Sequence, residues 1–569
     1  MRPILRGFGG GVAVAFLVTA SIAAAVVARR PISIPQNVDQ ATLERYHSTD
    51  QGTRIMPAAF LNSLRSDDGR RLMDSDQMRR WGFLVDGVPT NAANPYGWPL
   101  GFTVSDPKVT NGIPVAGVTC ALCHTGEIDY RGASIRIEGG QAYVDLPAFQ
   151  RAVFKSIADT AADPARRAAF LKDAVAAGYP ADRVENDFKA MVANAGDILF
   201  GQKGLTGTSP GPGRVDAVQG IANAVFGTFL HVTSNNRDYN APVNYPYLWD
   251  IWRLSWLQYN GFLPPDSDSR NIGEVLGTSG KADIVDPVTG ELNPVPERWR
   301  TSVQIKNLIW MEAVLKTLKA PTWPGQVLGP IDPARAERGR VLFTQNCASC
   351  HGIHELPNGE WDVHIVPLSY IGTDPNQATN WAGRTYDASK LGLGTVHATA
   401  LGGLVNTIRR QLYVDAAIPA SEQQGDVSFM APCGYKARPL IGVWATPPFL
   451  HNGSVRTVFD LLSDTRPKSF RYGSREYDPV NLGYTEDDSA NPAVLDTSLS
   501  GNSNAGHWWT DDTARPGRIG PRLSDAQKYA IIEFLKAATY ENYPRVKVAS
   551  MHPVACAENP GWAGAVATR

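Results

Sequence analysis

The sequence has no excess of either charge, since 54 lysine and arginine residues stand against 55 aspartate and glutamate residues, for a net charge of −1. This balance indicates neither a nucleic-acid partner nor an acidic polymer as substrate. After the first 30 residues there is no run long and apolar enough to span a bilayer. There is also no period-two run long enough to predict a large sheet. We therefore expect a body that lies outside the membrane and is mostly α.

The first 30 residues are the exception to the absence of long apolar runs. Arg2 and Arg6 precede an apolar stretch of about twenty residues, the length that spans a bilayer. Small residues at 23–28 are typical of a signal-peptide cleavage site, and Arg29–Arg30 leave the orientation ambiguous. The segment is interpreted as either a signal peptide or a membrane anchor. Both predict an exported protein, periplasmic or secreted, which stays attached to the inner membrane only if the segment is retained.

The chain is too long for one compact core at 569 residues, so two large domains are expected. A stretch rich in proline and glycine at 319–336 is typical of a linker. It divides the chain into an N-terminal domain at 31–320 and a C-terminal domain at 321–569.

Apolar residues at three- and four-residue spacing predict helices within these domains. The predicted helices are 163–178, 214–230, 334–352 and 523–539. Ser524 and Gln527 fit a capping box at the start of the last one. Segments 258–300 and 353–400 are predicted as long loops, and loops of that length usually wrap something.

Cysteine is scarce, and four of the six residues form two copies of one motif, in GVTCALCHTG at 117–126 and QNCASCHG at 345–352. Cys-x-x-Cys-His is the attachment signature of c-type haem: the thiols add to porphyrin vinyl groups and the histidine binds the iron. A redox dithiol would not need the histidine, and zinc would need two more ligands nearby. The sequence therefore predicts two covalently bound haem c groups. They attach at Cys120, Cys123 and His124, and at Cys347, Cys350 and His351.

The two remaining cysteines are Cys433 and Cys556. Haem c is assembled outside the cytoplasmic membrane, where the surroundings are oxidising. A disulfide between these two residues is the simplest hypothesis, and two free buried thiols are the alternative.

Two haems suggest a division of labour, which depends on the donor at the second face of each iron. For the second iron the sequence favours His507 in NSNAGHWWTDD, with His451 in PPFLHNGSV and Met430 as alternatives. The N-terminal domain offers only His231 as an internal spare histidine. We therefore expect the first iron to keep an open position for peroxide or O₂.

Tryptophans are concentrated between the two haem motifs, in NYPYLWDIWRLSWLQYNGF at 244–262. Trp249, Trp252 and Trp256 recur at three- and four-residue spacing, which is typical of the buried face of a helix. The functional alternative is that one indole relays electrons between the haems or lines the distal pocket of the open iron. Trp249 is the candidate relay.

The stretch YKARPLIGVWATPPFLHNGSVRTVFDLL at 435–462, together with the two haem motifs, resembles the bacterial di-haem cytochrome c peroxidase superfamily. Within it, NCASCHG, GRVDA, YPYLWD, SRNIGEVLG, GSREYDPVNLGY and NAGHWW are most similar to the di-haem c rubber oxygenases and their uncharacterised relatives. The similarity extends from about residue 80 to the end of the chain.

The resemblance implies two cytochrome-c-like haem domains that face each other. In the rubber oxygenases the first haem binds O₂ beneath an apolar side chain, a role that falls here on Phe262 (or its neighbour Leu263), and the second haem is bis-histidine, which implies His507. In the peroxidases a T-x-P element binds calcium between the domains, and Thr446 and Pro448 match it. No charged third ligand accompanies them, so calcium stays an open alternative.

The predicted function is that of an exported haem oxidoreductase, which activates peroxide or O₂ at the first haem and uses the second as electron relay. A peroxidase would take electrons from a small redox protein, and an oxygenase would cleave a carbon–carbon double bond in an apolar substrate. Glu274 is the candidate acid/base residue for peroxide, although it could equally cap a helix. The competing hypothesis is a pure electron-transfer protein in which both irons are six-coordinate.

Overall fold

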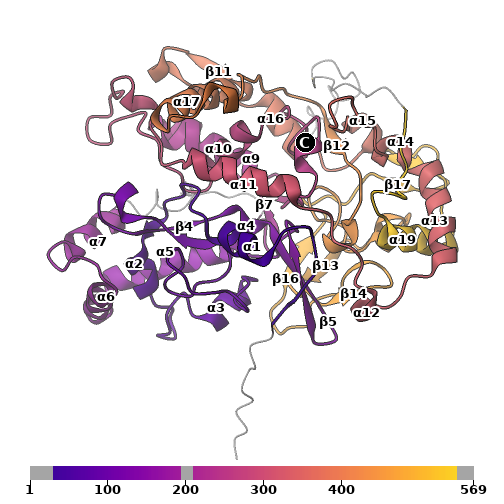
Figure 1. Cartoon of the computed structure of the whole chain (residues 1–569), viewed down its shortest axis with the longest axis horizontal. Helices are drawn as coiled ribbons and strands as arrows, with labels where there is room; N and C mark the ends of the chain where they lie inside the picture. Colours follow the sequence, from indigo (N-terminus) through magenta and orange to yellow (C-terminus); the bar gives the residue numbers. More distant parts are fainter. Residues whose placement is uncertain (1–29, 194–208, 548–555, 557–569) are drawn as a thin grey trace, which may run out of the picture.

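The computed structural model describes residues 30–193, 209–547 and 556 of the chain (Figure 1). The predicted targeting segment lies outside these residues, apart from Arg30. No helix within 30–193 or 209–547 combines the length and the apolar character that crossing a bilayer requires.

The fold mixes helices with small sheets, at 38% helix and 15% strand, so the prediction of a mostly α fold is wrong. Among the described residues the strands form eight sheets of only two or three strands each. Their strands are two to six residues long. Such short strands hold too few side chains for an alternating pattern to stand out in the sequence.

A group of helices packs on a small sheet in the N-terminal part of the chain (Figure 1, indigo and purple). Its members are α2 (Ala58–Ser63), α5 (Leu146–Ala162), α6 (Pro164–Ala176) and α7 (Val184–Ala193), with β2 (Met56–Pro57), β3 (Phe102–Val104) and β4 (Val115–Val118). The predicted helix at 163–178 is confirmed as α6. It begins there because the Asp163 side chain accepts hydrogen bonds from the first free backbone amides. The Phe60 ring fills the centre of this group, between Phe170 and Phe188.

The first haem motif runs directly into a hairpin of β5 (Thr125–Tyr130) and β6 (Ala133–Glu138), with β1 (Ile32–Ser33) paired in parallel to β6. The two-residue turn places Arg131 and Gly132 at positive φ, as tight hairpin turns require. The hairpin is buried on both faces, because Arg136 forms an ion pair with Glu127 on the side opposite the isoleucines. The sequence of β6 alternates polar and apolar residues at 134–138, but this alternation is too short to indicate a large sheet.

A second group of helices surrounds α10 (Ser267–Gly277). It contains α9 (Ala217–Ala222), α11 (Ile305–Thr317) and α17 (Leu401–Asp415). The predicted helix at 214–230 is confirmed from Ala217 to Thr228, as α9 and the wide helical turn that continues it, but its first two residues form the strand β7 (Arg214–Val215) instead. The loop prediction for 258–300 is wrong where α10 forms, and its buried Ile272, Val275 and Leu276 carry the helical spacing that was missed.

The loop prediction for 353–400 is also wrong in part. This segment contains β9 (His364–Pro367), α15 (Leu368–Ile371), α16 (Asn376–Gly383), β10 (Thr385–Asp387) and β11 (Thr395–His397).

In the C-terminal part, α13 (Pro333–Asn346) leads into α14 (Ala348–His351) and packs on α19 (Asp525–Ala537), on the right of Figure 1. Both predicted helices, 334–352 and 523–539, are confirmed, as is the capping box of α19. The helices cross closely at Gly339, where a Cβ atom would lie 1.8 Å from the carbonyl oxygen of Ala530. Only glycine fits at that crossing.

The remaining helices and strands are short and connect these groups. They are α1 (Gln40–Ser48), α3 (Ser75–Arg80), α12 (Gly325–Leu328), α18 (Val458–Leu461), β7 (Arg214–Val215), β8 (Val243–Asn244), β12 (Gly434–Ala437), β13 (Ser469–Tyr472), β14 (Tyr477–Asp478), β15 (Gly483–Tyr484), β16 (Ala493–Asp496), β17 (Trp508–Trp509) and β18 (Arg518–Gly520). One hydrophobic core includes side chains from both predicted domains, such as Trp249 and Phe534. The domain boundary at 320/321 stays a prediction.

Candidate haem sites

The first Cys-x-x-Cys-His motif forms a single helical turn, α4 (Cys120–Cys123), between β4 and β5. His124 ends this turn, and its Nδ1 lies 2.8 Å from the carbonyl oxygen of Pro246. A proton on Nδ1 makes this a hydrogen bond and leaves the Nε2 lone pair for a metal. Burial lowers the pKa of His124 to about 4, so the imidazole is neutral at ordinary pH, as a ligand must be.

A cavity of 320 Å³ adjoins this motif, within the range of about 300–1,000 Å³ that is usual for cofactor sites. Cys120, Cys123 and His124 line it together with many apolar side chains, including Phe102, Leu248 and Leu315. Its polar lining includes Gln258, Arg270, Glu274, Lys436 and Arg438. An apolar wall with several cations suits a flat apolar macrocycle that carries carboxylates. The residues present therefore fit a haem held by this motif.

Zinc does not fit the two motifs as well as haem does. A structural zinc needs four protein ligands. In the described ranges of the chain, no three or more His, Cys, Asp or Glu side chains gather closely enough to hold a metal ion. Haem c needs only the two thiols and one histidine that each motif provides.

Glu274 lies on the wall of the first cavity, as its candidate role requires, and it does not cap α10. Its Oε1 accepts a hydrogen bond of 2.9 Å from the Gln258 side chain. Burial raises the pKa of Glu274, and the hydrogen bond and the nearby Arg270 oppose this shift. A buried carboxyl group with a raised pKa on a cavity is typical of an acid/base residue.

Gln258 is the residue of this site that the sequence analysis missed. It occupies the left-handed region, with φ of 62°, which is uncommon for a residue other than glycine and often marks a functional site. Nothing in the sequence around it indicated that its side chain meets one from α10.

Phe262 is not brought to the first site. Its ring is buried against Trp381 and Phe429, with centroids 4.4 and 5.3 Å away. It is not among the residues that line the cavity, whereas Gln258 and Tyr259 are.

The second motif follows α13 directly, and α14 carries His351. The Nδ1 of His351 lies 2.9 Å from the carbonyl oxygen of Arg438, which repeats the arrangement of the first site. The ring of His507 faces it, with the two centroids 6.4 Å apart. This gap admits one metal atom between two nitrogens, because metal–imidazole bonds are about 2.0–2.1 Å long.

The backbone around His507 is arranged for this approach. His507 and Gly506 both have positive φ, and a Cβ on Gly506 would lie 2.3 Å from the Ile371 carbonyl oxygen. Burial lowers the pKa of His507 to about 3. Its Nδ1 has no hydrogen-bond partner within the described residues. Strain and an unpartnered buried nitrogen both indicate a ligand position.

The alternative ligand His451 does not take this position. Its ring stacks on Tyr435 at 3.9 Å, and burial lowers its pKa to about 3. Met430 is partly exposed, and its carbonyl oxygen accepts a hydrogen bond from Trp381.

The tryptophan-rich segment is not a helix, so the helix-face interpretation is wrong. Only residues Ile251–Arg253 form a short 3₁₀ turn. Trp249 is fully buried, stacks on Tyr247 at 4.5 Å and donates from Nε1 to the carbonyl oxygen of Ile441, at 2.9 Å. It lies against the segment that follows Arg438, whose carbonyl holds His351. Its role as relay stays a prediction.

The candidate calcium ligands have other partners. The Thr446 hydroxyl donates to Val443 O at 3.1 Å, and the Pro448 carbonyl accepts from the Asn244 side chain at 2.7 Å. Calcium at this position stays a prediction.

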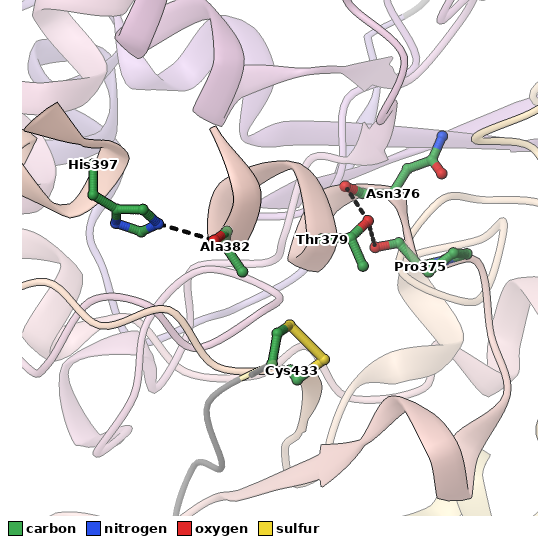
Figure 2. Close-up of a disulfide and its surroundings, with 7 residues drawn as sticks. Pro375, Asn376, Thr379, Ala382, His397 and Cys433 are labelled. Carbon is green, nitrogen blue, oxygen red and sulfur yellow. Dashed lines mark hydrogen bonds between the residues drawn. A yellow bond between two sulfur atoms is a disulfide. The ribbon is translucent and has the colours of Figure 1, made fainter. Parts of the chain in front are cut away.

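The disulfide between Cys433 and Cys556 is confirmed, with Cα atoms 4.4 Å apart. Figure 2 shows it beside α16, whose Thr379 donates to the Pro375 carbonyl and whose Ala382 carbonyl contacts His397. The bond attaches Cys556 to the residue directly before β12, the strand that contains Tyr435.

Residues 434–471 match a family described as RoxA-like, cytochrome c-like, which implies covalently bound haem c. The uncharacterized protein y4iJ of Sinorhizobium fredii is 32% identical over 567 residues, covering 88% of this chain and 92% of the relative. The uncharacterized protein y4iM of the same organism is 30% identical over 232 residues, covering 36% of this chain and 49% of that protein. The similarity to a rubber-oxygenase-like cytochrome is thus supported, whereas the peroxidase superfamily as a whole is not shown.

Proposed function

This chain belongs to the same family as the y4iJ protein of Sinorhizobium fredii, and from that premise and its cytochrome c-like segment we propose that it is an exported di-haem c oxidoreductase. In this proposal peroxide is reduced beside His124, and the site of His351 and His507 delivers the electrons. The observation that carries the proposal is the asymmetry of the two sites. A second histidine faces His351, whereas the described lining of the cavity at His124 contains no other histidine and no methionine.

Haem at the first motif would supply a redox-active iron with a free coordination position. The Pro246 carbonyl holds the proton of His124 on Nδ1, so Nε2 stays available as ligand. Glu274 accepts a proton from incoming peroxide and returns it to the departing oxygen, while Gln258 orients its carboxylate. Reduction of peroxide to two waters takes up two electrons and two protons, and the proposed source of electrons is a small external redox protein.

The second candidate is cleavage of a carbon–carbon double bond in an apolar substrate by O₂. The RoxA-like match favours it. Peroxide is preferred because polar Glu274 and Gln258 line the cavity, while the apolar Phe262 does not. A pocket that protects an O₂ adduct is expected to be apolar instead.

The purified mature protein tests the proposal in two steps. Mass spectrometry should give the mass of the chain plus two haem groups, and fewer would contradict the proposal. Electron paramagnetic resonance should then show one high-spin and one low-spin iron, with peroxide consumed when a reduced donor is present. Two low-spin irons that bind neither CO nor cyanide would favour a function in electron transfer alone. Consumption of O₂ in the presence of an alkene, without consumption of peroxide, would favour the oxygenase.

A further inference from the structure

Two extended segments from distant parts of the chain are joined side by side between the two haem sites. Arg438 donates from Nη1 to the carbonyl of Tyr247, at 3.0 Å, and from Nη2 to that of Trp249, at 3.1 Å. In return, Tyr247 donates from its hydroxyl to the Pro439 carbonyl at 2.6 Å, and Trp249 donates to that of Ile441. Four side chain–backbone hydrogen bonds thus connect residues almost 200 positions apart.

The same two segments hold the proximal histidines of both sites. His124 is held by the carbonyl of Pro246, directly before Tyr247. His351 is held by the carbonyl of Arg438 itself. The backbone of Arg438 therefore fixes one imidazole, while its side chain fixes the segment that orients the other.

Arg438 is suited to this double contact. Its guanidinium lies 3.5 Å above the ring of Tyr247, and its Nε is buried without a hydrogen-bond partner in the described part of the chain. Arginine presents its donors in a rigid planar fork, so two separate nitrogen atoms reach the two carbonyls in a fixed geometry, whereas lysine has to donate from a single nitrogen atom. Removing the fork would leave the carbonyls of Tyr247 and Trp249 without these donors in a confined space.

We propose that Arg438 is a positioning residue that couples the two haem sites and carries the electron path between them. The inference rests on the proposed function. A path of covalent bonds and hydrogen bonds runs from His124 to His351 through the Pro246–Tyr247 peptide and Arg438. It contains three hydrogen bonds, of 2.8, 3.0 and 2.9 Å. With haem bound at both motifs, this path would carry one electron from the second site, which would be oxidised, to the first, which would be reduced, without any bond forming or breaking.

The test compares Arg438→Met with wild type and with Arg456→Met. Arg456 is a matched control, because it is also half-buried and donates from Nη1 to a backbone carbonyl, that of Tyr484 at 3.0 Å. After loading with two haems is verified by mass, the midpoint potential and spin state of each haem are measured. Stopped-flow absorption then gives the rate of electron transfer between the haems.

Arg438→Met should keep the second haem low-spin, since the backbone carbonyl remains. It should shift the potential of the first haem and slow the transfer between haems about 10-fold, the lower end of the range by which loss of groups that orient metal ligands reduces activity. Arg438→Lys should give an intermediate rate, and Arg456→Met the wild-type rate. Trp249→Phe distinguishes this path from an indole relay. If the rate of electron transfer falls in Trp249→Phe but not in Arg438→Met, the proposal is overturned.

A wild-type rate and an unchanged first-haem potential in Arg438→Met would also overturn the inference. If Arg438→Met does not take up haem, Arg438→Lys is measured instead. A wild-type rate and an unchanged first-haem potential in that variant would overturn the inference. Failure of the proposed function is seen separately, because it appears in the wild-type protein as fewer than two haems or as two low-spin irons.

Discussion

At the scale of single residues, chemistry in this protein depends on side chains whose surroundings hold them in one protonation state. His124, His451 and His507 are all kept neutral by burial. The pKa of Glu274 shifts in the opposite direction, because burial raises it and favours the protonated, neutral form of the carboxyl group. A neutral imidazole can bind metal, and a carboxyl group with a raised pKa can exchange protons nearer to neutral pH.

Replacing Glu274 by glutamine should reduce peroxide turnover roughly 10²–10⁴-fold, the usual contribution of a general acid/base. Haem content and the spectra should be unchanged, because glutamine has nearly the same shape. Glu185→Gln, at an exposed position of α7, is the control and should retain full turnover. Turnover in Glu274→Gln equal to that of the control would remove Glu274 from the mechanism.

The pH profile of turnover follows from the same residue. Glu274 must be ionised to accept a proton, so turnover should fall as pH drops through its pKa. Since that pKa is raised, the acid limb should lie above the ordinary glutamate value of about 4.3. The limb should be absent from the residual activity of Glu274→Gln.

His507→Ala should convert the second iron from low spin to a form that binds CO, because it removes the imidazole that faces His351. His451→Phe keeps a ring against Tyr435 and should leave the spectrum of the second iron unchanged. Both variants can be compared by electron paramagnetic resonance and CO difference spectra. A spectral change in His451→Phe alone would assign the ligand to His451.

At the scale of secondary-structure elements, each haem motif is a short helical turn whose position depends on the elements next to it. The turn of the second motif continues α13, and α13 is fixed by its crossing with α19. That crossing is close enough for the Gly339 position to touch the backbone of Ala530.

Gly339→Ala should therefore destabilise the fold by about 1–3 kcal/mol, as overpacking typically does. Gly403→Ala in α17 is the control, because no atom lies within 4 Å of its added Cβ and alanine favours helix. Thermal and denaturant unfolding of both variants measures the difference. Equal stability of the two would show that α13 and α19 can separate without cost.

At the scale of the whole molecule, one hydrophobic core contains side chains from both parts of the chain, and a disulfide cross-links the chain near its C-terminal end. The disulfide joins Cys433 to Cys556, 123 positions apart in the sequence. A cross-link of this span restricts the unfolded chain, so it stabilises the fold by roughly 2–4 kcal/mol.

The double replacement of Cys433 and Cys556 by serine should lower the free energy of unfolding by that amount and leave the haem content at the wild-type value. Reduction of the wild-type protein should reproduce the loss. A thiol titration of the denatured, unreduced protein should detect no free thiol, and two reactive thiols would contradict the disulfide.

The sequence by itself determined the haem attachment residues, the pairing of the last two cysteines as the simplest hypothesis, and the helices predicted at 163–178, 334–352 and 523–539. Each of these depends on chemistry within a few neighbouring residues or on a count of what remains. Only the tertiary structure decided that Gln258 meets Glu274, that His507 rather than His451 faces His351, and that Arg438 connects the two sites. These contacts join segments brought together by packing, and neither helical nor strand periodicity carries information about such long-range partners.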